Sequence, residues 1–316
     1  MQNITLRQLR SLRAIHGSAK ISTAARTLGL TAPAVTLQLQ QLESEIGLPL
    51  FDRTPDGMRP TAAGLAVLEA ARAIDERLRL LKDEIGALTE GKTGNLRLGV
   101  VSTAKYFAPR LIAAFLKQHP GIQVDLFVGN RADTIAALKR HDLDTALMGR
   151  PPRDVPVRSL MFGDHPFVII APADHALAQK CNITKAEIAL QRFLIREPGS
   201  GTRTSLEVYF ADIPEKLEDL GIEMGSNETI KQAVMAGLGI AFISAHTIEQ
   251  ELQLKRLVIL DVEGMPITRQ WFGVSRLDRS ISPTMKAFNE FLTREGAASL
   301  PVFEKMPRRR LLQGGR

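Results

Sequence analysis

The sequence predicts an α/β protein that begins with an all-helical segment carrying a wing and continues through one long helix. Three observations support this fold class. Residues 21–47 contain two short helical patterns, residues 61–90 keep one apolar seam, and from Leu96 onward strand and helix patterns alternate. Such alternation implies a parallel sheet. A chain of 316 residues is long enough for two or three domains, each with its own core.

Residues 21–47 have the layout of a helix-turn-helix. Ser22 can cap the first helix, Gly29 allows a tight turn, and Thr31 can cap the second helix with Pro33 in its first turn. The second helix has an apolar face made of Val35, Leu39, Leu42 and Ile46. Its other face is small and polar, which predicts a helix that reads DNA. The alternative is a helical hairpin inside an ordinary core.

The flanking residues fit the DNA-reading interpretation. Residues 4–16 predict a supporting helix, and residues 48–62 predict a wing that turns at 55–57. Arg53 and Arg59 of the wing can reach a phosphate or an adjacent minor groove, although a plain surface hairpin is the alternative. The residues expected at the DNA are Thr31, Ala32, Pro33, Ala34, Thr36, Leu37, Gln38, Gln40, Arg53 and Arg59. Among them, Thr36, Gln38 and Gln40 are expected to contact bases or grooves.

One long helix is predicted from Thr61 to Glu90, and its apolar residues repeat like a coiled coil. The seam consists of Val67, Ala71, Ile74, Leu78, Leu81, Ile85 and Leu88, at alternating gaps of four and three. A lone helix has little reason to keep such a seam, so we expect a dimer with paired helices. A dimer carries two reading helices and matches a site with twofold half-sites.

Charge and composition narrow the class of protein. The net charge is +7, of which residues 1–62 contribute +3 and residues 304–316 contribute +4. A basic N-terminal domain suits a polyanion, whereas the basic tail is either solvated or in contact with DNA. No signal peptide and no membrane-spanning run are visible, so we expect a cytoplasmic protein. The single cysteine, Cys181, excludes an internal disulfide and is interpreted as inert rather than as a redox sensor.

Enzyme interpretations find little support. GALTEGKT at 86–93 matches the P-loop pattern, but a helix is predicted before it and a strand after it, the reverse of what a nucleotide site needs. We interpret the segment as a helix end, with Gly91 as its cap, followed by a hinge. The six histidines are scattered, no cysteine pair exists, and no nucleophile elbow is present. We therefore expect no catalytic residues, no metal and no cofactor.

A ligand site is expected where the loops follow the strands. In a sheet of this kind, ligands bind beyond the carboxyl ends of the strands, at helix N-termini. The hydroxyls, glycine and cations of three loops suit a carboxylate or phosphate. The candidates are Ser102, Thr103, Lys105, Ser200, Gly201, Thr202, Arg203, Asn227 and Glu228, with Asn130, Arg131 and Arg150 as weaker ones. The alternative is that the hydroxyls only cap helices and that the cations are solvated.

From Leu6 to about Leu300 the chain resembles the LysR-type transcriptional regulators. The most specific motifs are TLRQLR at 5–10, STAARTLGLT at 22–31, PAVT at 33–36, QLE at 41–43, GLPLFDR at 47–53 and PTAAG at 60–64. VSTAKYFAPRL at 101–111, VGNR at 128–131, MGRPP at 148–152 and EPGSGTR at 197–203 resemble the CbbR branch, which controls Calvin-cycle operons. The chain departs from the family at Ala32, where Gln is usual, and at Leu37, where Arg is frequent.

The resemblance implies a domain plan and a function. It implies a winged helix-turn-helix domain at 1–62, a linker helix at 63–90, a hinge at 91–95, an effector-binding domain at 96–295 and a basic tail at 296–316. The effector domain would resemble a periplasmic binding protein, with lobe I at 96–162 plus 266–295 and lobe II at 163–265. The sequence pattern alone does not reveal this crossing of the chain between lobes.

Partners also follow from the resemblance. They are double-stranded promoter DNA, a second copy of the chain in a dimer or tetramer, RNA polymerase, and an effector. The effector would be a phosphorylated or carboxylated metabolite or a nicotinamide nucleotide. Two alternatives are a LysR-type regulator of redox, stress or other metabolic genes and a cytosolic small-molecule binding protein whose helices only dimerise it.

Overall fold

The computed structural model describes residues 3–88 and 93–303, and it divides the chain into two compact units, Met1–Lys82 and Asp83–Arg316. The first unit is mainly helical and the second is α/β, so the predicted fold class is confirmed. The predicted Gly91 cap and most of the basic tail lie outside the described residues. The predicted helix before the P-loop-like segment and the strand after it are both present, because a helix ends at Leu88 and a strand begins at Gly94.

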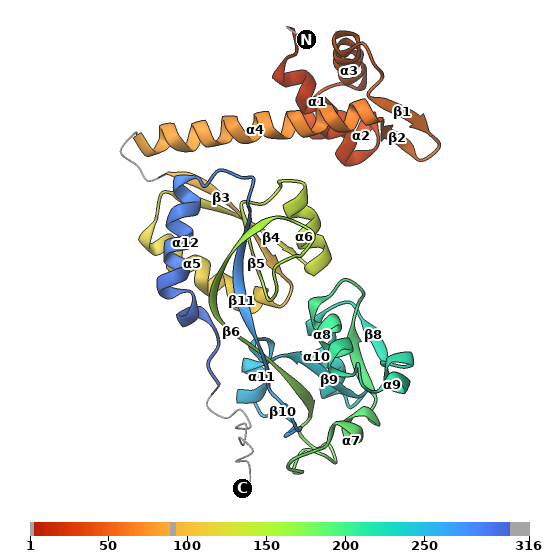
Figure 1. Cartoon of the computed structure of the whole chain (residues 1–316), viewed down its shortest axis with the longest axis vertical. Coiled ribbons are helices and arrows are strands. Elements are labelled where there is room, and N and C mark those ends of the chain that lie inside the picture. The colour runs from red at the N-terminus through yellow and green to blue at the C-terminus, as the bar shows by residue number, and fades with distance from the viewer. Residues whose placement is uncertain (1–2, 89–92, 304–316) are drawn as a thin grey trace. The chain divides into compact units, whose positions relative to one another are not determined.

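Three helices, a wing and the start of a long helix form the N-terminal unit. The elements are α1 (Leu6–Ser18), α2 (Ile21–Leu28), α3 (Ala32–Ile46), β1 (Phe51–Thr54), β2 (Gly57–Pro60) and α4 (Ala62–Leu88). The helix-turn-helix, the wing and the long helix therefore all appear where the sequence predicts them. Figure 1 shows α1, α2 and α3 at one end of α4, next to the two short strands of the wing.

The turn between α2 and α3 follows the local sequence. Gly29 has φ +65°, a left-handed conformation that glycine adopts without a Cβ penalty. The Thr31 side chain accepts a hydrogen bond from the backbone N–H of Ala34 and caps α3, with Pro33 in the first turn. The predicted Ser22 cap is wrong. The chain leaves α1 through a left-handed Ala19, so α2 begins at Ile21 and Ser22 already lies inside its first turn.

The apolar face of α3 closes the core of this unit. Val35, Leu39 and Leu42 are buried together with residues of α1 and α2, and Ile46 packs at the edge. Leu50 and Phe51 anchor the wing in the same core. Burial of this face fixes the rotation of α3 about its axis and leaves its opposite face in solvent.

The seam of α4 changes character along the helix. Ala71 is buried in the unit's own core. Farther along, Ile74, Leu78, Leu81 and Ile85 are between 39% and 52% exposed in the single chain. A row of exposed apolar side chains at heptad spacing is what the predicted coiled-coil pairing requires.

The second unit contains the remaining helices and strands. The strands are β3 (Gly94–Val101), β4 (Ile122–Gly129), β5 (Thr145–Met148), β6 (Val157–Pro172), β7 (Phe193–Arg196), β8 (Ile222–Met224), β9 (Ile240–Ser244), β10 (Leu257–Ile259) and β11 (Ile267–Arg276). The helices are α5 (Ala108–Gln118), α6 (Arg131–Lys139), α7 (Lys185–Ala189), α8 (Gly201–Tyr209), α9 (Pro214–Glu218), α10 (Asn227–Met235), α11 (Glu249–Gln253) and α12 (Pro283–Glu295). Three short 3₁₀ turns are η1 (Ala104–Tyr106), η2 (Ala245–Thr247) and η3 (Ala297–Ser299).

These strands form one nine-stranded sheet that is mixed rather than parallel. The order is β4-β3-β5-β11-β6-β9-β7-β8, with β10 also paired to β6. The βαβ units at the two ends are parallel, as predicted, but β6 and β11 run antiparallel to all their neighbours. The prediction of a wholly parallel sheet is therefore wrong in the middle. Two long strands return the chain between the two ends, and neither follows a crossover helix.

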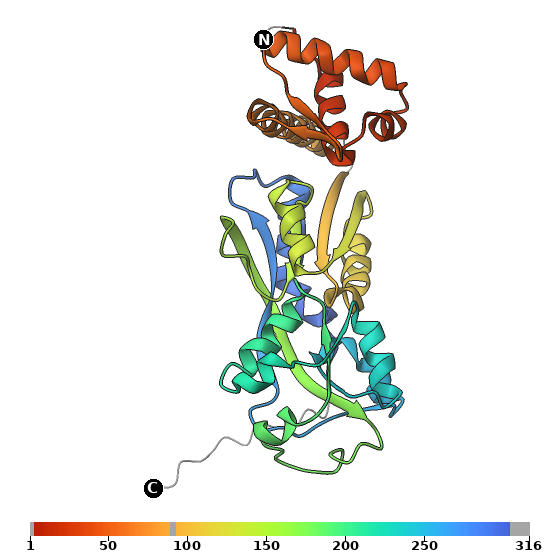
Figure 2. The ribbon, with the colours of Figure 1, turned by 90° about the vertical axis from the view of Figure 1, so that its right-hand side faces the viewer.

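The antiparallel pair β6 and β11 links two separate cores. One core gathers side chains of β3, β5, α5 and α12. The other belongs to β7 and β9, with α8 on one face of these strands and α10 on the other. Figures 1 and 2 show these two groups of elements at opposite ends of β6 and β11. β6 runs without a break from Val157 to Pro172. The boundary expected between Phe162 and Gly163 therefore falls inside a continuous strand, and the boundary after Met265 falls just before β11.

Candidate functional site

The exposed face of α3 presents few charges and several small or apolar side chains. Pro33 and Gln40 are exposed, and Leu37 is 54% exposed at the centre of this face. Ala32 and Ala34, also expected at the DNA, are half-buried beside them. Between Ala32 and Leu42 the helix carries no Lys or Arg, so the side chains that this face offers to a base edge are Gln, Thr and apolar ones.

Gln38 and Thr36 of α3 are both engaged within the protein. The Ser11 hydroxyl of α1 donates a hydrogen bond to Oε1 of Gln38. The Thr36 hydroxyl donates to the carbonyl of Ala32, one turn earlier at 3.0 Å. Within the described residues the amide nitrogen of Gln38 has no partner, so this side chain is oriented by Ser11 and keeps two N–H donors.

The wing presents its two arginines to solvent. Arg53 and Arg59 are exposed on adjacent strands, where Asp52 lies opposite Arg59 in the register. The wing is held to α1 by a backbone hydrogen bond from Met58 to the carbonyl of Ala19 at 2.8 Å. A Cβ at Gly57 would lie 2.3 Å from that carbonyl oxygen, so the close approach requires glycine. The two arginine side chains are thus exposed, while the backbone of the wing is held in place against the end of α1.

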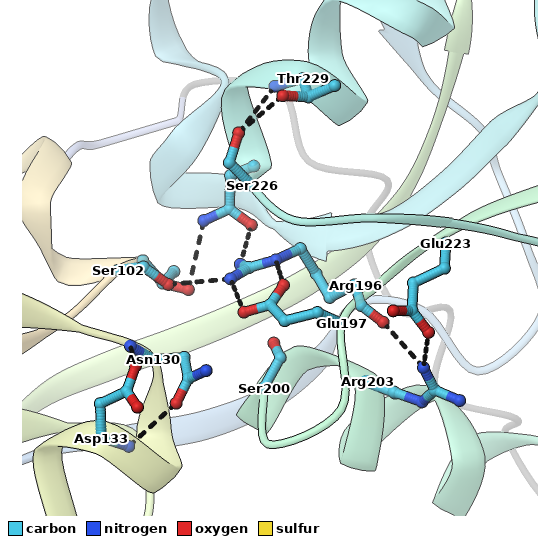
Figure 3. Close-up of polar contacts among 12 residues, drawn as sticks. Ser102, Asn130, Asp133, Arg196, Glu197, Ser200, Arg203, Glu223, Ser226 and Thr229 are labelled. Atoms are coloured by element: carbon cyan, nitrogen blue, oxygen red, sulfur yellow. Dashed lines mark hydrogen bonds and ion pairs between the residues drawn. The ribbon is translucent and has the colours of Figure 1, made fainter. Parts of the chain in front are cut away.

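A second polar cluster lies in the α/β unit, around the side chain of Arg196. Arg196 ends β7, is only 2% exposed, and is the one charged residue in an apolar strand. Its Nη2 donates to the Ser102 hydroxyl at 3.1 Å (Figure 3). Its Nη1 donates to Oδ1 of Asn227. The Asn227 amide in turn lies 3.5 Å from the Thr103 hydroxyl. The ends of β3 and β7 and the start of α10 therefore meet at one guanidinium.

Glu197 provides the counter-charge for Arg196. Nε of Arg196 lies 2.6 Å from Oε2 of Glu197, and Nη2 lies 2.8 Å from Oε1. This is a bidentate pair, the strongest geometry of an Arg–carboxylate contact. Neither residue was among the sequence candidates. The signal that could have identified Arg196 is a lone cation at the end of the otherwise apolar strand FLIR.

Ser200, Gly201 and Thr202 lie beside this pair, at the start of α8. Ser200 occupies the N-cap position, but its side chain makes no cap hydrogen bond, and its hydroxyl points toward the Arg196–Glu197 pair (Figure 3). Ser200 and Thr202 are 3% and 5% exposed, respectively. A Cβ on Gly201 would lie 3.3 Å from Cδ of Arg131, so α8 approaches α6 closely here. Pure helix capping therefore does not account for the Ser200 side chain.

Arg203 is directed elsewhere, toward β8. Its Nη1 lies 2.7 Å from Oε2 of Glu223 (Figure 3). Its Nε lies 3.0 Å from Oε1 of Glu207. The hydrogen bond to Glu223 raises the pKa of Arg203 above its ordinary value. Arg203 also donates to the backbone carbonyl of Arg196 at 3.2 Å, so it supports the loop that carries Arg196.

The remaining candidates surround the cluster without joining it. Asn130 caps α6 in a capping box with Asp133, while the backbone N–H of Ala132 donates to the carbonyl of Gly199. Arg150 is exposed, and burial together with the Arg150 charge lowers the pKa of Arg131. Lys105 is exposed, with its Nζ 5.2 Å from the centre of the Tyr106 ring.

Glu228 belongs to a neighbouring cluster with Tyr106 and Lys231. The Tyr106 hydroxyl donates to Glu228 at 3.2 Å, and the ring covers the buried ammonium of Lys231 at 4.7 Å. Lys231 also pairs with Glu251 at 2.7 Å. Burial and the Glu228 carboxylate raise the pKa of Tyr106 well above its ordinary value, which keeps the phenol protonated as a donor.

The buried guanidinium, the flanking hydroxyls and an amide form a set suited to holding an anion. Across residues 3–88 and 93–303, no three His, Cys, Asp or Glu side chains gather to hold a metal ion. Within the same ranges no helix is both long and apolar enough to cross a membrane.

Two family models match the two parts of the chain. Residues 6–65 match the model described as bacterial regulatory helix-turn-helix protein, lysR family, and residues 89–297 match the model described as LysR substrate binding domain. Together they span the helix-turn-helix with its wing and nearly the whole α/β unit.

Curated relatives are similar over almost their full length. The chain is 61% identical over 305 residues to the HTH-type transcriptional regulator CbbR of Sinorhizobium medicae, covering 96% of this chain and 97% of that protein. It is 44% identical over 295 residues to the RuBisCO operon transcriptional regulator of Allochromatium vinosum, covering 93% and 97%.

Solved structures agree in fold. The regulatory domain of CcmR from Synechocystis PCC6803 in complex with 2-PG is 35% identical, with a TM-score of 0.59, over 64% of this chain and 96% of that one. Full-length CbnR in complex with its target DNA has a TM-score of 0.62 over 93% of this chain and 100% of that one. At 20% identity, the likeness to CbnR shows the fold alone.

Proposed function

Because the chain belongs to the LysR family of bacterial transcriptional regulators, we propose that it controls carbon-fixation genes in response to a small anionic metabolite. As a LysR-type regulator it is a DNA-binding protein and not an enzyme. The proposed regulon is supported by the relatives named CbbR and RuBisCO operon transcriptional regulator, to which the chain is 61% identical over 305 residues and 44% identical over 295 residues.

The effector class rests on one observation, the buried Arg196. The Arg196 guanidinium is 2% exposed and lies where β3 and β7 end. Burying a charged group costs free energy, so its placement there favours a role in binding. A phosphorylated or carboxylated metabolite, or a nicotinamide nucleotide, offers the oxygens that this group binds best. The 2-PG carried by the related CcmR domain supports this choice.

We further infer that the chain works as a dimer through α4 and assembles into a tetramer. The exposed seam at Ile74, Leu78, Leu81 and Ile85 supports the dimer. Such an assembly would bind the promoter in the cytoplasm, where RNA polymerase can contact it.

The experiment that tests the function is footprinting on the promoter of a carbon-fixation operon. The purified chain is titrated at two salt concentrations, alone and with 2-PG, a sugar bisphosphate or NADPH. We expect a specific footprint that one of these anions extends or shortens. A footprint that no anion changes would remove the proposed effector class, and the absence of any specific footprint would remove the proposed regulon.

A further inference from the structure

The Arg196 guanidinium is already occupied, and the group that occupies it is the next residue in the chain. Arg has five N–H donors. Glu197 accepts from Nε and Nη2, Ser102 accepts from Nη2, and Asn227 accepts from Nη1. The Nε–Nη2 edge, which a carboxylate or phosphate binds with two parallel hydrogen bonds, is the edge that Glu197 holds.

Glu197 also stands on the solvent side of the pair. The Arg196 side chain is 2% exposed, whereas the Glu197 side chain is 20% exposed. Asn227, on the opposite side of the guanidinium, is 1% exposed. An anion that arrives from solvent therefore meets the Glu197 carboxylate before it can reach the bidentate edge of Arg196.

The backbone position of Glu197 allows this carboxylate to leave. Glu197 follows β7 and precedes α8, in a loop where Pro198 and Gly199 are exposed and Gly199 has φ +86°. Its side chain takes no part in capping α8, so moving it breaks no hydrogen bond of a helix or a strand.

We infer that Glu197 is a built-in competitor for the anion site and thereby determines which effectors the protein accepts. The inference rests on the proposed anion site at Arg196. An incoming anion takes the bidentate edge of Arg196 only when it displaces Glu197. The displaced carboxylate moves into solvent, and the buried guanidinium never remains without a counter-charge.

Such a competitor selects by charge. Glu197 is tethered one residue away, so its effective concentration at Arg196 is high. A monocarboxylate offers Arg196 the same two oxygens and the same single charge as Glu197, so replacing Glu197 with it brings no gain in binding free energy. A phosphate group brings a second charge and a third oxygen, which can also accept from Ser102 or Ser200. The site therefore discriminates phosphate-bearing anions from simple carboxylates.

The test compares the full chain with Glu197→Gln, which keeps the shape and removes the charge. Inorganic phosphate and acetate are titrated by isothermal calorimetry or nuclear magnetic resonance. We expect the dissociation constant for phosphate to fall by about tenfold or more. We also expect acetate, which wild type rejects, to bind the variant measurably. Glu223→Gln is the matched control, since Glu223 pairs with Arg203 instead of Arg196, and it should leave both constants unchanged.

Glu197→Asp supplies a second variant if the amide destabilises the loop. Its shorter carboxylate keeps the charge but loses the bidentate reach, so phosphate should bind more tightly than in wild type and acetate should still be excluded. Thermal melting of each variant checks its fold.

The outcomes separate this inference from the proposed function. If 2-PG or another anion shifts the wild-type footprint while Glu197→Gln binds phosphate no better or more weakly, Glu197 is a ligand contact or a structural residue and the inference fails alone. If neither wild type nor variant binds phosphate at millimolar concentrations, the anion site itself is overturned.

Discussion

The indole Nε1 of Trp271 donates a hydrogen bond to Nδ1 of His246 at 3.0 Å, with both rings buried. His165 stacks on a face of this indole, with 3.9 Å between the ring centroids. Both ring nitrogens of His165 lack a hydrogen-bond partner among the described residues. The three rings tie η2 to the antiparallel pair β6 and β11, and this arrangement requires neutral histidines.

Stability is therefore expected to fall on mild acidification. Burial lowers the pKa of His246 to about 4, against 6.5 in an unfolded chain, and burial lowers the pKa of His165 as well. Between these pH values the unfolded chain binds more protons, so its free energy drops relative to the folded state as pH falls. His246 alone should cost about 2 kcal/mol between pH 7 and pH 5.

Urea unfolding followed by the fluorescence of the single tryptophan, Trp271, measures this dependence. His165→Phe keeps a ring on Trp271 and removes one titrating group, so its stability should vary less with pH than that of wild type. A wild-type stability that is the same at pH 7 and pH 5 would show that these histidines are not held neutral.

Gln38→Ala should reduce specific DNA binding by about 1–3 kcal/mol and reduce non-specific binding less. The reason is that Ser11 fixes Oε1 of Gln38, so the amide N–H groups are available to a base edge. Affinities for an operator fragment and a scrambled fragment give the two values. Ser11→Ala releases the Gln38 side chain but leaves its two N–H donors in place, so it should reduce specific binding by a smaller amount. Equal losses on both fragments would make Gln38 a structural residue.

Arg59→Ala should weaken DNA binding by a similar factor on every sequence. The side chain is exposed on the wing and suits a phosphate contact, whose loss lowers the salt dependence of the affinity by about one counterion. Binding at several salt concentrations measures the slope. Arg256→Ala removes an exposed cation of the α/β unit and should leave the slope unchanged. A loss confined to one operator sequence would instead place Arg59 at a base.

Arg196→Lys should shift the effector response to concentrations at least about tenfold higher, because lysine cannot form the bidentate contact. Arg203→Lys should leave the response close to wild type, since Arg203 serves Glu223 and Glu207. Footprint titrations with the active anion compare the two variants. If Arg203→Lys shifted the effector response more than Arg196→Lys, Arg203 would be the cation that binds the effector, as the sequence predicts.

The sequence predicts the reading helix well because its determinants are local. Gly29, Thr31 and Pro33 act within one or two turns, and the apolar spacing of α3 fixes its buried face. The prediction that Ser22 caps α2 fails because the chain turns at the left-handed Ala19, so α2 already begins at Ile21. A cap-forming residue near a helix start is only one of several competing signals.

The sheet and the anion cluster depend on distant partners, which a sequence pattern does not contain. β6 continues through residues 157–165 because β11, more than a hundred residues later, pairs with it. The pattern EPGSGTR suggests that Arg203 is the ligand-facing cation, whereas Glu207 one turn later holds it on the outer face of α8. Arg196 faces inward because its strand is buried along its whole length, which the sequence shows only as an apolar run.

The pairing of β6 with β11 slips by one residue between Trp271 and Phe272, so Phe162 has no opposite partner there. Such a bulge increases the local twist of a ribbon while the ladder on each side stays intact. We expect the two cores to move relative to each other by torsion of this ribbon. Amide protons of β6 on both sides of Phe162 should then exchange slowly with deuterium, with and without effector. The bulge would then act as a twisting joint between the two cores, while the hydrogen bonds of the ladder on either side of it stay formed.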